Sequence, residues 1–298
     1  MLSRTRILRF AVVAVVVAGG AATGAAFARQ DGASPIQAAL AKTAAAGSFR
    51  FTFAFTVSGV KGLPGGGGAI SLTGSGASDT KHGNASLSLN LGALSKTLGA
   101  AAGGASLPPT IDLVVVHNVV YVHLAALAKQ LSPTTPGKEW LKIDAKSLPK
   151  SATGGANLGQ LSTVNPQQAL AALSNAVSVK KLGSAKVRGT GTTHYAGTLD
   201  LSRLSGLVPK AQQSSFAQSL KKAGLRTVPF DVWIDGHSLL SRLSVHVDHL
   251  KAGTAGTASI RASFDIFDYG VKLKIAAPPA SKTVDAGKLL AGLAGGTG

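Results

Sequence analysis

Apolar and polar residues alternate along several short stretches of the chain, and the clearest stretch covers residues 48–57. Its apolar positions are Phe49, Phe51, Phe53, Phe55 and Val57. Alternation with a period of two places successive side chains on opposite faces of a β-strand. The pattern therefore predicts a strand with one polar face and one face of four phenylalanines, and those rings require a large apolar partner.

Similar patterns recur along the chain and predict about ten short strands. Leu87 and Leu89 alternate with serines, and Val115 lies in a later alternating run that turns at His117-Asn118. Asp235-Gly236 stands between two further alternating runs, which is a strong hairpin signal. Because most consecutive strands are joined by short turns, the sequence favours an antiparallel sheet.

Three amphipathic stretches predict helices, at residues 35–46, 166–176 and 209–223. Ser34 is a candidate N-cap of the first helix, and Gly47 follows it as a stop. A sheet with a single apolar face either curls around its contents or is covered by helices. The residues therefore predict an α+β fold.

The charge of the chain adds a constraint on its partners. Lys and Arg number 30 against 12 acidic residues, which gives a formal charge of +18. A cationic protein favours anionic partners, and here we expect transient contact with an anionic membrane surface or with a membrane transporter. The basic residues are scattered and form no aromatic-interleaved basic helix, so no nucleic-acid partner is expected.

The first 28 residues have the pattern of an export signal. Arg4, Arg6 and Arg9 precede an apolar run, and Ala26-Phe27-Ala28 is a small-x-small cleavage signal. We therefore expect a signal peptide at 1–28, a single domain at 29–285 and a flexible tail at 286–298. An uncleaved anchor is the competing interpretation. Under both interpretations we expect the protein to be exported, to the cell envelope or a periplasm-like space or as a secreted protein. An uncleaved signal would keep it tethered.

The sequence contains no recognisable catalytic or metal-binding constellation. It has no cysteine, a single glutamate, Glu139, and no Gly-x-Ser-x-Gly or His-Glu-x-x-His motif. His246 and Asp248 would face one side of a strand and His249 the other, so they cannot share one metal without a bulge. We therefore expect that the protein is not an enzyme and that it binds no cofactor and no metal ion. The apolar stripes then have two interpretations, a plain core or a cavity for an acyl chain.

Three ordered motifs in the second half of the chain resemble the LppX/LprG family of actinobacterial envelope lipoproteins. The stretch from Gly191 to Asp200, Gly-Thr-Thr-His-Tyr-Ala-Gly-Thr-Leu-Asp, is similar to one strand of that family. Val228 to Asp235, Val-Pro-Phe-Asp-Val-Trp-Ile-Asp, is similar to its next strand. Phe267-Asp-Tyr-Gly270 resembles its closing hairpin. The chain departs from the family in one respect, because it lacks the lipobox cysteine.

The resemblance implies a LolA-like fold, in which a strongly curved antiparallel sheet forms half a barrel with helices packed on its concave face. It also implies non-catalytic binding and transport of an acylated lipid or glycolipid in the cell envelope. The lining expected from the strand and helix patterns consists of Phe49, Phe51, Phe53, Phe55, Leu87, Leu89, Val115, Tyr195, Phe216, Leu220 and Trp233. The alternative is an envelope scaffold or sensor with a collapsed core and a protein partner.

Overall fold

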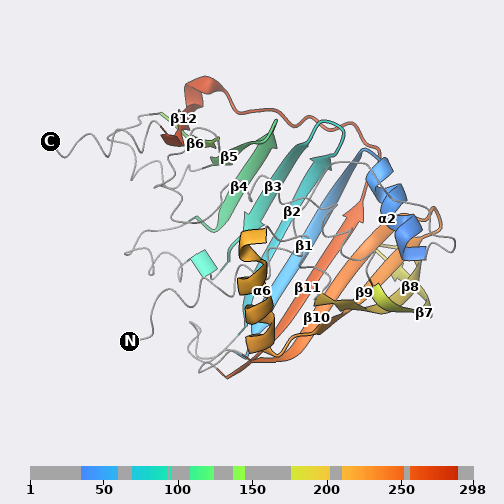
Figure 1. Cartoon of the computed structure of the whole chain (residues 1–298). Helices are drawn as coiled ribbons and strands as arrows, with labels where there is room; N and C mark the ends of the chain where they lie inside the picture. The colour runs from blue at the N-terminus through green and yellow to red at the C-terminus, as the bar shows by residue number, and fades with distance from the viewer. Residues whose placement is uncertain are drawn as a thin grey trace.

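The computed structural model describes residues 35–59, 69–92, 94–95, 108–123, 137–144, 176–201, 210–251 and 256–287. Within them, 12 strands form one open sheet (Figure 1). The strands are β1 (Ser48–Ser58), β2 (Ile70–Asp79), β3 (Asn84–Asn90), β4 (Thr110–Val116), β5 (Val119–His123), β6 (Trp140–Ile143), β7 (Ala176–Val187), β8 (Thr190–Asp200), β9 (Thr227–Asp235), β10 (Leu240–Lys251), β11 (Thr257–Phe267) and β12 (Thr283–Asp285).

The sheet consists of two meanders that meet in its middle. Strands β1 to β6 follow one another in space as they do in sequence, and so do β7 to β11. The two meanders are joined where β1 pairs with β11, antiparallel, with Phe53 opposite Phe264. The turn predicted at His117-Asn118 is confirmed between β4 and β5, where both residues adopt a positive φ.

The prediction of a purely antiparallel sheet is wrong at one edge. Strand β12 pairs with β6 in parallel, so the sheet is mixed. After β11 the chain runs extended across the ends of the strands and reaches the far edge through the 3-10 helix η4 (Ala280–Lys282) (Figure 1). We call residues 271–282 the strap. Apolar and polar residues alternate at 271–276 in the way that predicts a strand, but in the structure these residues belong to the strap and form no strand of the sheet.

The strap is fixed at both ends by contacts with strands that lie far away in sequence. At its start, the hydroxyl of Ser48 donates a hydrogen bond to the carbonyl of Val271 at 2.6 Å. At its end, Lys138 donates to the carbonyl of Ser281 at 2.7 Å, and Lys282 lies 3.1 Å from a carboxylate oxygen of Glu139. Parallel pairing of β12 with β6 is the result, because the strap carries the chain back along the sheet before β12 begins.

One face of the sheet is apolar, as the alternation predicts, and we call it the apolar face. It is defined by the odd-numbered residues of β1 and by the residues that lie opposite them along the ladder. On the neighbouring strands these residues include Ile260, Phe264 and Ile266 on β11, Leu243 and Val245 on β10, Phe230 and Val232 on β9, and Leu87 and Leu89 on β3. Polar residues such as Thr52 and Ser88 alternate with them and belong to the other face.

Two glycines of β2 make room for phenylalanine rings of the neighbouring strand. A Cβ atom at Gly74 would lie 2.5 Å from the ring of Phe53, and one at Gly76 would lie 2.6 Å from the ring of Phe51. The two rings therefore lie across β2 in the space that a side chain would otherwise fill. Glycine in a strand interior commonly marks such a close approach.

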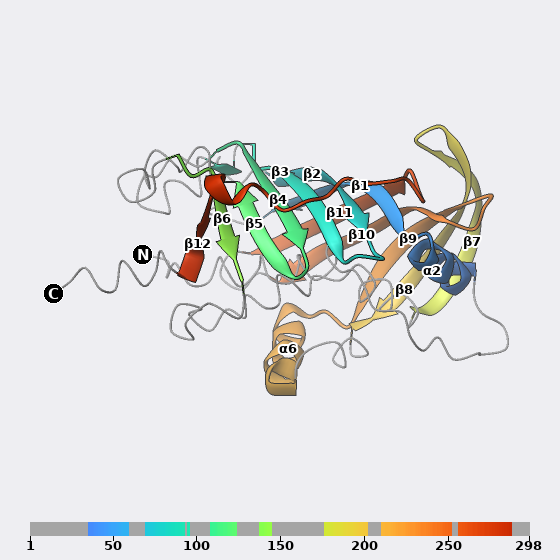
Figure 2. The same cartoon turned by 90° about the horizontal axis from the view of Figure 1, so that it is seen from above.

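Two helices contribute apolar residues to the face. Helix α2 (Pro35–Ala45) buries Ile36, Ala39 and Leu40 in a first core cluster with strand residues such as Phe49 and Phe230. Helix α6 (Lys210–Ala223) places Leu220 in a second cluster, with Val228, Val247 and Leu250 among its members. Figure 2 shows α2 beside the strands β8 and β9, where the end of the sheet curls.

The helix expected at 166–176 lies outside the described residues, apart from Ala176, which begins β7. The expected signal peptide at 1–28 and residues 288–298 of the expected tail also lie outside them. Within the described part of the chain, no helix is long and apolar enough to cross a membrane.

A tyrosine on the turn after β11 gives the first core cluster a pH dependence. The hydroxyl of Tyr269 donates a hydrogen bond to the carbonyl of the buried Leu240. Burial raises the pKa of Tyr269 well above its ordinary value. Folding therefore favours the neutral form of the Tyr269 side chain. The stability that this preference contributes is present below the ordinary tyrosine pKa of about 10 and is lost as the pH rises further.

Replacing Tyr269 with Phe should therefore lower the free energy of unfolding by about 1 kcal/mol at neutral pH, because the hydrogen bond is lost. Above the ordinary tyrosine pKa, stability should fall less steeply in Tyr269→Phe than in the unmodified protein. Denaturant unfolding at a series of alkaline pH values measures both effects. Identical alkaline slopes in the two proteins would show that this phenol does not carry the dependence.

Candidate functional site

The four phenylalanines of β1 occupy one face but differ in their surroundings. Phe49 is 2% exposed and belongs to the core cluster beneath α2. Phe51 is half-buried, packs against that cluster and stacks on Phe264 with ring centroids 5.0 Å apart. Phe53 and Phe55 are half-buried and belong to neither core cluster.

The next three expected lining residues continue the apolar face across the first meander. Leu87 lies opposite Gly76 and Leu89 opposite Gly74, so both face the same side as Phe51 and Phe53. Val115 lies opposite Ala85 on the same side. All three are half-buried and belong to neither core cluster. Together with Phe53 and Phe55 they form what we call the open half of the apolar face.

The expected lining residues of the second meander lie within packed structure. Tyr195 pairs with the fully buried Val232 and packs against the first core cluster. Leu220 is 9% exposed and is part of the second cluster. Phe216 is on α6, and its side chain lies outside the described residues.

Trp233 was expected on the apolar face, and the structure places it on the opposite face. Its ring stacks on His194 with centroids 4.3 Å apart and planes 7° apart, while its neighbours Val232 and Ile234 are buried in the core. The reason is that successive side chains of a strand point to opposite faces. Because Phe230, Val232 and Ile234 point to the apolar face, Trp233 between them points to the other face. The alternation in the sequence already contains this information.

The outer face around Trp233 carries a group of polar residues on β8 to β11. His194 lies 2.8 Å and His246 lies 3.8 Å from the carboxylate of Asp231, which stands between them. Arg242 forms a two-point ion pair with Asp265, at 2.5 and 2.7 Å, and these hydrogen bonds raise the pKa of Arg242. Among the described residues, no group of His, Asp and Glu side chains is arranged to hold a metal ion.

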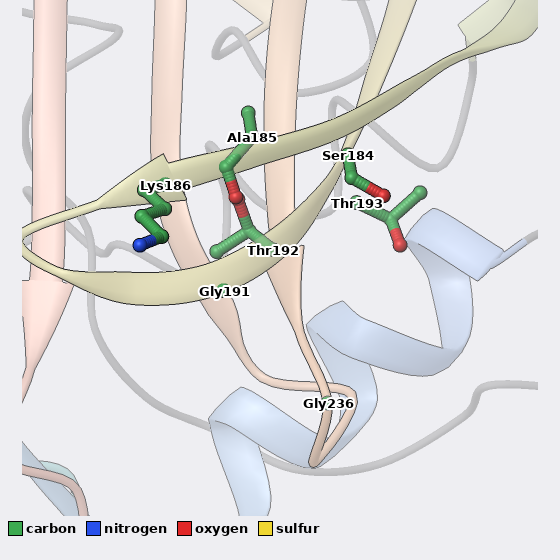
Figure 3. Close-up of a pocket in the computed structure, with 7 residues that line it drawn as sticks. All are labelled: Ser184, Ala185, Lys186, Gly191, Thr192, Thr193 and Gly236. Atoms are coloured by element: carbon green, nitrogen blue, oxygen red, sulfur yellow. The ribbon is translucent and has the colours of Figure 1, made fainter.

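A shallow, open pocket of about 490 Å³ (Figure 3) lies beside β7. This strand and β12 are the two opposite edges of the sheet. It is lined by residues of the β7–β8 hairpin and of the β9–β10 turn, namely Ser184, Ala185, Lys186, Gly191, Thr192, Thr193 and Gly236. None of these residues belongs to the expected lipid-binding set. Its lining residues include one lysine and three residues with hydroxyl side chains.

Comparison with curated proteins finds two relatives from Streptomyces, while no family model matches the chain. An uncharacterized 31.2 kDa protein of Streptomyces griseus is 31% identical over 173 residues, which cover 56% of this chain and 55% of that protein. A protein of Streptomyces coelicolor, described as a candidate lipoprotein, is 27% identical over 172 residues, 57% of this chain and 50% of that protein. The chain thus spans about half the length of the curated relatives it matches.

Comparison with solved structures finds two mycobacterial proteins, among others. The lipoprotein LppX of Mycobacterium tuberculosis has a TM-score of 0.43 and 15% identity, with 81% of this chain and 96% of LppX covered. LprF from Mycobacterium bovis has a TM-score of 0.44 and 14% identity, with 82% of this chain and 95% of LprF covered. LppX shares its name with the LppX/LprG family that the sequence motifs resemble.

Proposed function

We propose that the protein binds an acylated lipid or glycolipid without catalysis and transports it in the cell envelope. The observation that carries this proposal is the open half of the apolar face. Phe53, Phe55, Leu87, Leu89 and Val115 turn toward one side of the sheet, and none of them belongs to the two clusters that α2 and α6 close. An acyl chain is a ligand that such a surface can bind.

The free energy of binding an acyl chain comes mainly from burying apolar surface, so the site needs no charged groups. Each buried methylene contributes about 0.8 kcal/mol, so a long chain can bind well through apolar contact alone. The rings of Phe51 and Phe53 lie close to Gly76 and Gly74 and add apolar surface at β2. We further propose the complete LolA-like arrangement, in which the helices lie across the concave side of the sheet and hold the lipid between them and the strands.

We also propose that the protein works after export, either secreted or tethered by an uncleaved signal sequence. The support is the basic, apolar pattern of residues 1–28, together with the similarity to a Streptomyces coelicolor protein described as a candidate lipoprotein and to the mycobacterial lipoprotein LppX. A carrier in that compartment would exchange its lipid during brief contact with an anionic membrane surface or a membrane transporter.

The second candidate function is an envelope scaffold or sensor, and the packed half of the sheet favours it. Both core clusters are closed by helix residues, and the most buried side chains, such as Phe49 and Val232, lie in the first of them. If the same tight packing extended over the open half of the apolar face, no lipid would fit. The two functions therefore predict different results when that half is changed.

We expect Leu89→Glu to lower the amount of bound lipid several-fold, because a carboxylate on the apolar face would lose its hydration beside an acyl chain. The matched control is Ser88→Glu, one residue away on β3 and on the opposite face. Both proteins are purified gently, extracted with organic solvent and analysed by mass spectrometry against the unmodified protein. The control should retain the full lipid content.

Two outcomes would reject the carrier. One is the absence of extractable lipid in the unmodified protein. The other is equal lipid content in Leu89→Glu and Ser88→Glu while only Leu89→Glu loses thermal stability, which is the result expected for a collapsed core.

A further inference from the structure

The edge strand β7 exposes apolar side chains to solvent, in contrast with the rest of the described sheet. Val179 is 37% and Leu182 is 50% exposed, and these are the exposed large hydrophobic side chains of the described residues. Leu182 owes its exposure to a bulge, because the ladder with β8 shifts register between Lys181 and Gly183 and leaves Leu182 without a partner residue. A bulge can redirect a side chain in this way.

Basic residues surround the exposed pair on the same strand. Lys180 and Lys181 stand between Val179 and Leu182, and Lys186 follows toward the hairpin turn. All three lysines are exposed, and within the described part of the chain none of them forms an ion pair with a carboxylate. The strand therefore presents uncompensated positive charge together with apolar side chains.

Lysines and bulges on an edge strand also serve a defensive purpose, since they prevent pairing with the strands of other proteins. That purpose accounts for the lysines and for the bulge. It does not account for the two exposed apolar side chains, because an exposed leucine promotes the association that the lysines would prevent. Apolar side chains within a basic surface are instead the pattern of a protein that binds at an anionic membrane interface.

The pocket of Figure 3 lies next to this surface and suits the same partner. Lys186 and the cross-strand pair Ser184 and Thr193 line it, and no carboxylate is among its lining residues. A lysine with two hydroxyl groups can bind the phosphate of a lipid head group. The pocket is thus placed to receive a lipid head group while Leu182 contacts the boundary between the head groups and the acyl chains.

We propose that β7 is the surface by which the protein binds an anionic phospholipid bilayer, with Leu182 and Val179 entering the interface. Lys181 and Lys186, which lie on the same face of the strand, face the phosphates. The proposal deepens the proposed lipid function, because a carrier has to meet a membrane to exchange its cargo. It concerns a site separate from the open half of the apolar face, so the two can fail independently.

The test is co-sedimentation of the full chain with vesicles, either an equimolar mixture of phosphatidylcholine and phosphatidylglycerol or phosphatidylcholine alone. The readout is the ratio of the two affinities. Each variant is compared with the unmodified full chain, because both carry the same basic and apolar residues near the N-terminus. We expect preference for the anionic vesicles, a reduction of about fivefold for each lysine removed, and therefore a reduction of more than tenfold in Lys181→Gln/Lys186→Gln. Leu182→Ser should weaken binding to the anionic vesicles as well.

The matched control is Lys272→Gln/Lys274→Gln, which removes the same charge from two exposed lysines of the strap. The control should keep most of the preference for anionic vesicles. The proposal is overturned if both double variants lose binding equally, since net charge alone would then explain it, or if the unmodified protein shows no preference between the vesicles. Lipid extraction from Leu182→Ser separates the sites, because its bound lipid should be unchanged while its vesicle binding falls.

Discussion

Replacing Phe49 with alanine should lower the free energy of unfolding by about 3–5 kcal/mol, which is the usual range for a large aromatic side chain removed from a core. Phe49 is 2% exposed and lies in the cluster closed by α2. Its ring centroid is 6.2 Å from that of Phe51 and 6.1 Å from that of Tyr269. The change would therefore leave a cavity where the helix, the strand and the turn after β11 meet.

The control for this variant is Phe55→Ala on the same strand and the same face. Phe55 is half-buried and belongs to neither core cluster, so its removal should cost clearly less stability. If the protein carries lipid, Phe55→Ala should instead reduce the lipid that is recovered. Denaturant unfolding and lipid extraction on both variants distinguish a core residue from a lining residue, and an equal loss of stability would contradict the distinction.

A second large effect is expected from Gly76→Ala. The added Cβ atom would lie 2.2 Å from the carbonyl oxygen of Ser86 and 2.6 Å from the ring of Phe51. The ring could move, but the carbonyl belongs to the neighbouring strand, so β3 would have to shift. We expect a loss of up to about 3 kcal/mol in the free energy of unfolding, the upper part of the range for overpacking.

Gly191→Ala is the matched control for the glycine variant. Gly191 also lies on a strand, β8, and a Cβ atom there would have nothing within 4 Å. Because alanine restricts the unfolded chain, this change should be neutral or should raise stability by about 0.4–1 kcal/mol. Thermal unfolding followed by circular dichroism compares the two proteins, and similar melting temperatures would refute the role given to Gly76.

Much of the sheet could be predicted from the sequence because strand alternation is a local property. The apolar positions of β1 and β3 and the turns at His117-Asn118 and Asp235-Gly236 are each encoded within a few residues. Since most strands pair with their sequence neighbours, local turns also determine most of the ladder. The outward position of Trp233 could have been predicted by the same rule, from the alternation of Phe230, Val232 and Ile234.

The parts that could not be predicted depend on contacts between distant residues. Nothing local in β1 indicates that its second neighbour is β11, and nothing in Thr283–Asp285 indicates a parallel strand on β6. The difference between Phe49 in the core and Phe55 in the open half of the apolar face arises in the same way, because it depends on where α2 packs. The alternation places all four phenylalanine rings of β1 on the same face, but it does not predict which of them is more deeply buried.

The two-meander arrangement has a consequence for the order in which the protein can fold. Within each meander the strands are sequence neighbours, so both can form by closing short loops. The first meander, however, is bordered on one side by β11 and on the other by β12, both from the last part of the chain. During synthesis, β1 and β6 are therefore edges without partners until the C-terminal segment emerges. Strand β12, which follows the strap, then pairs with β6 and closes the second of these edges. Such non-local pairings are the slow events of β-sheet folding.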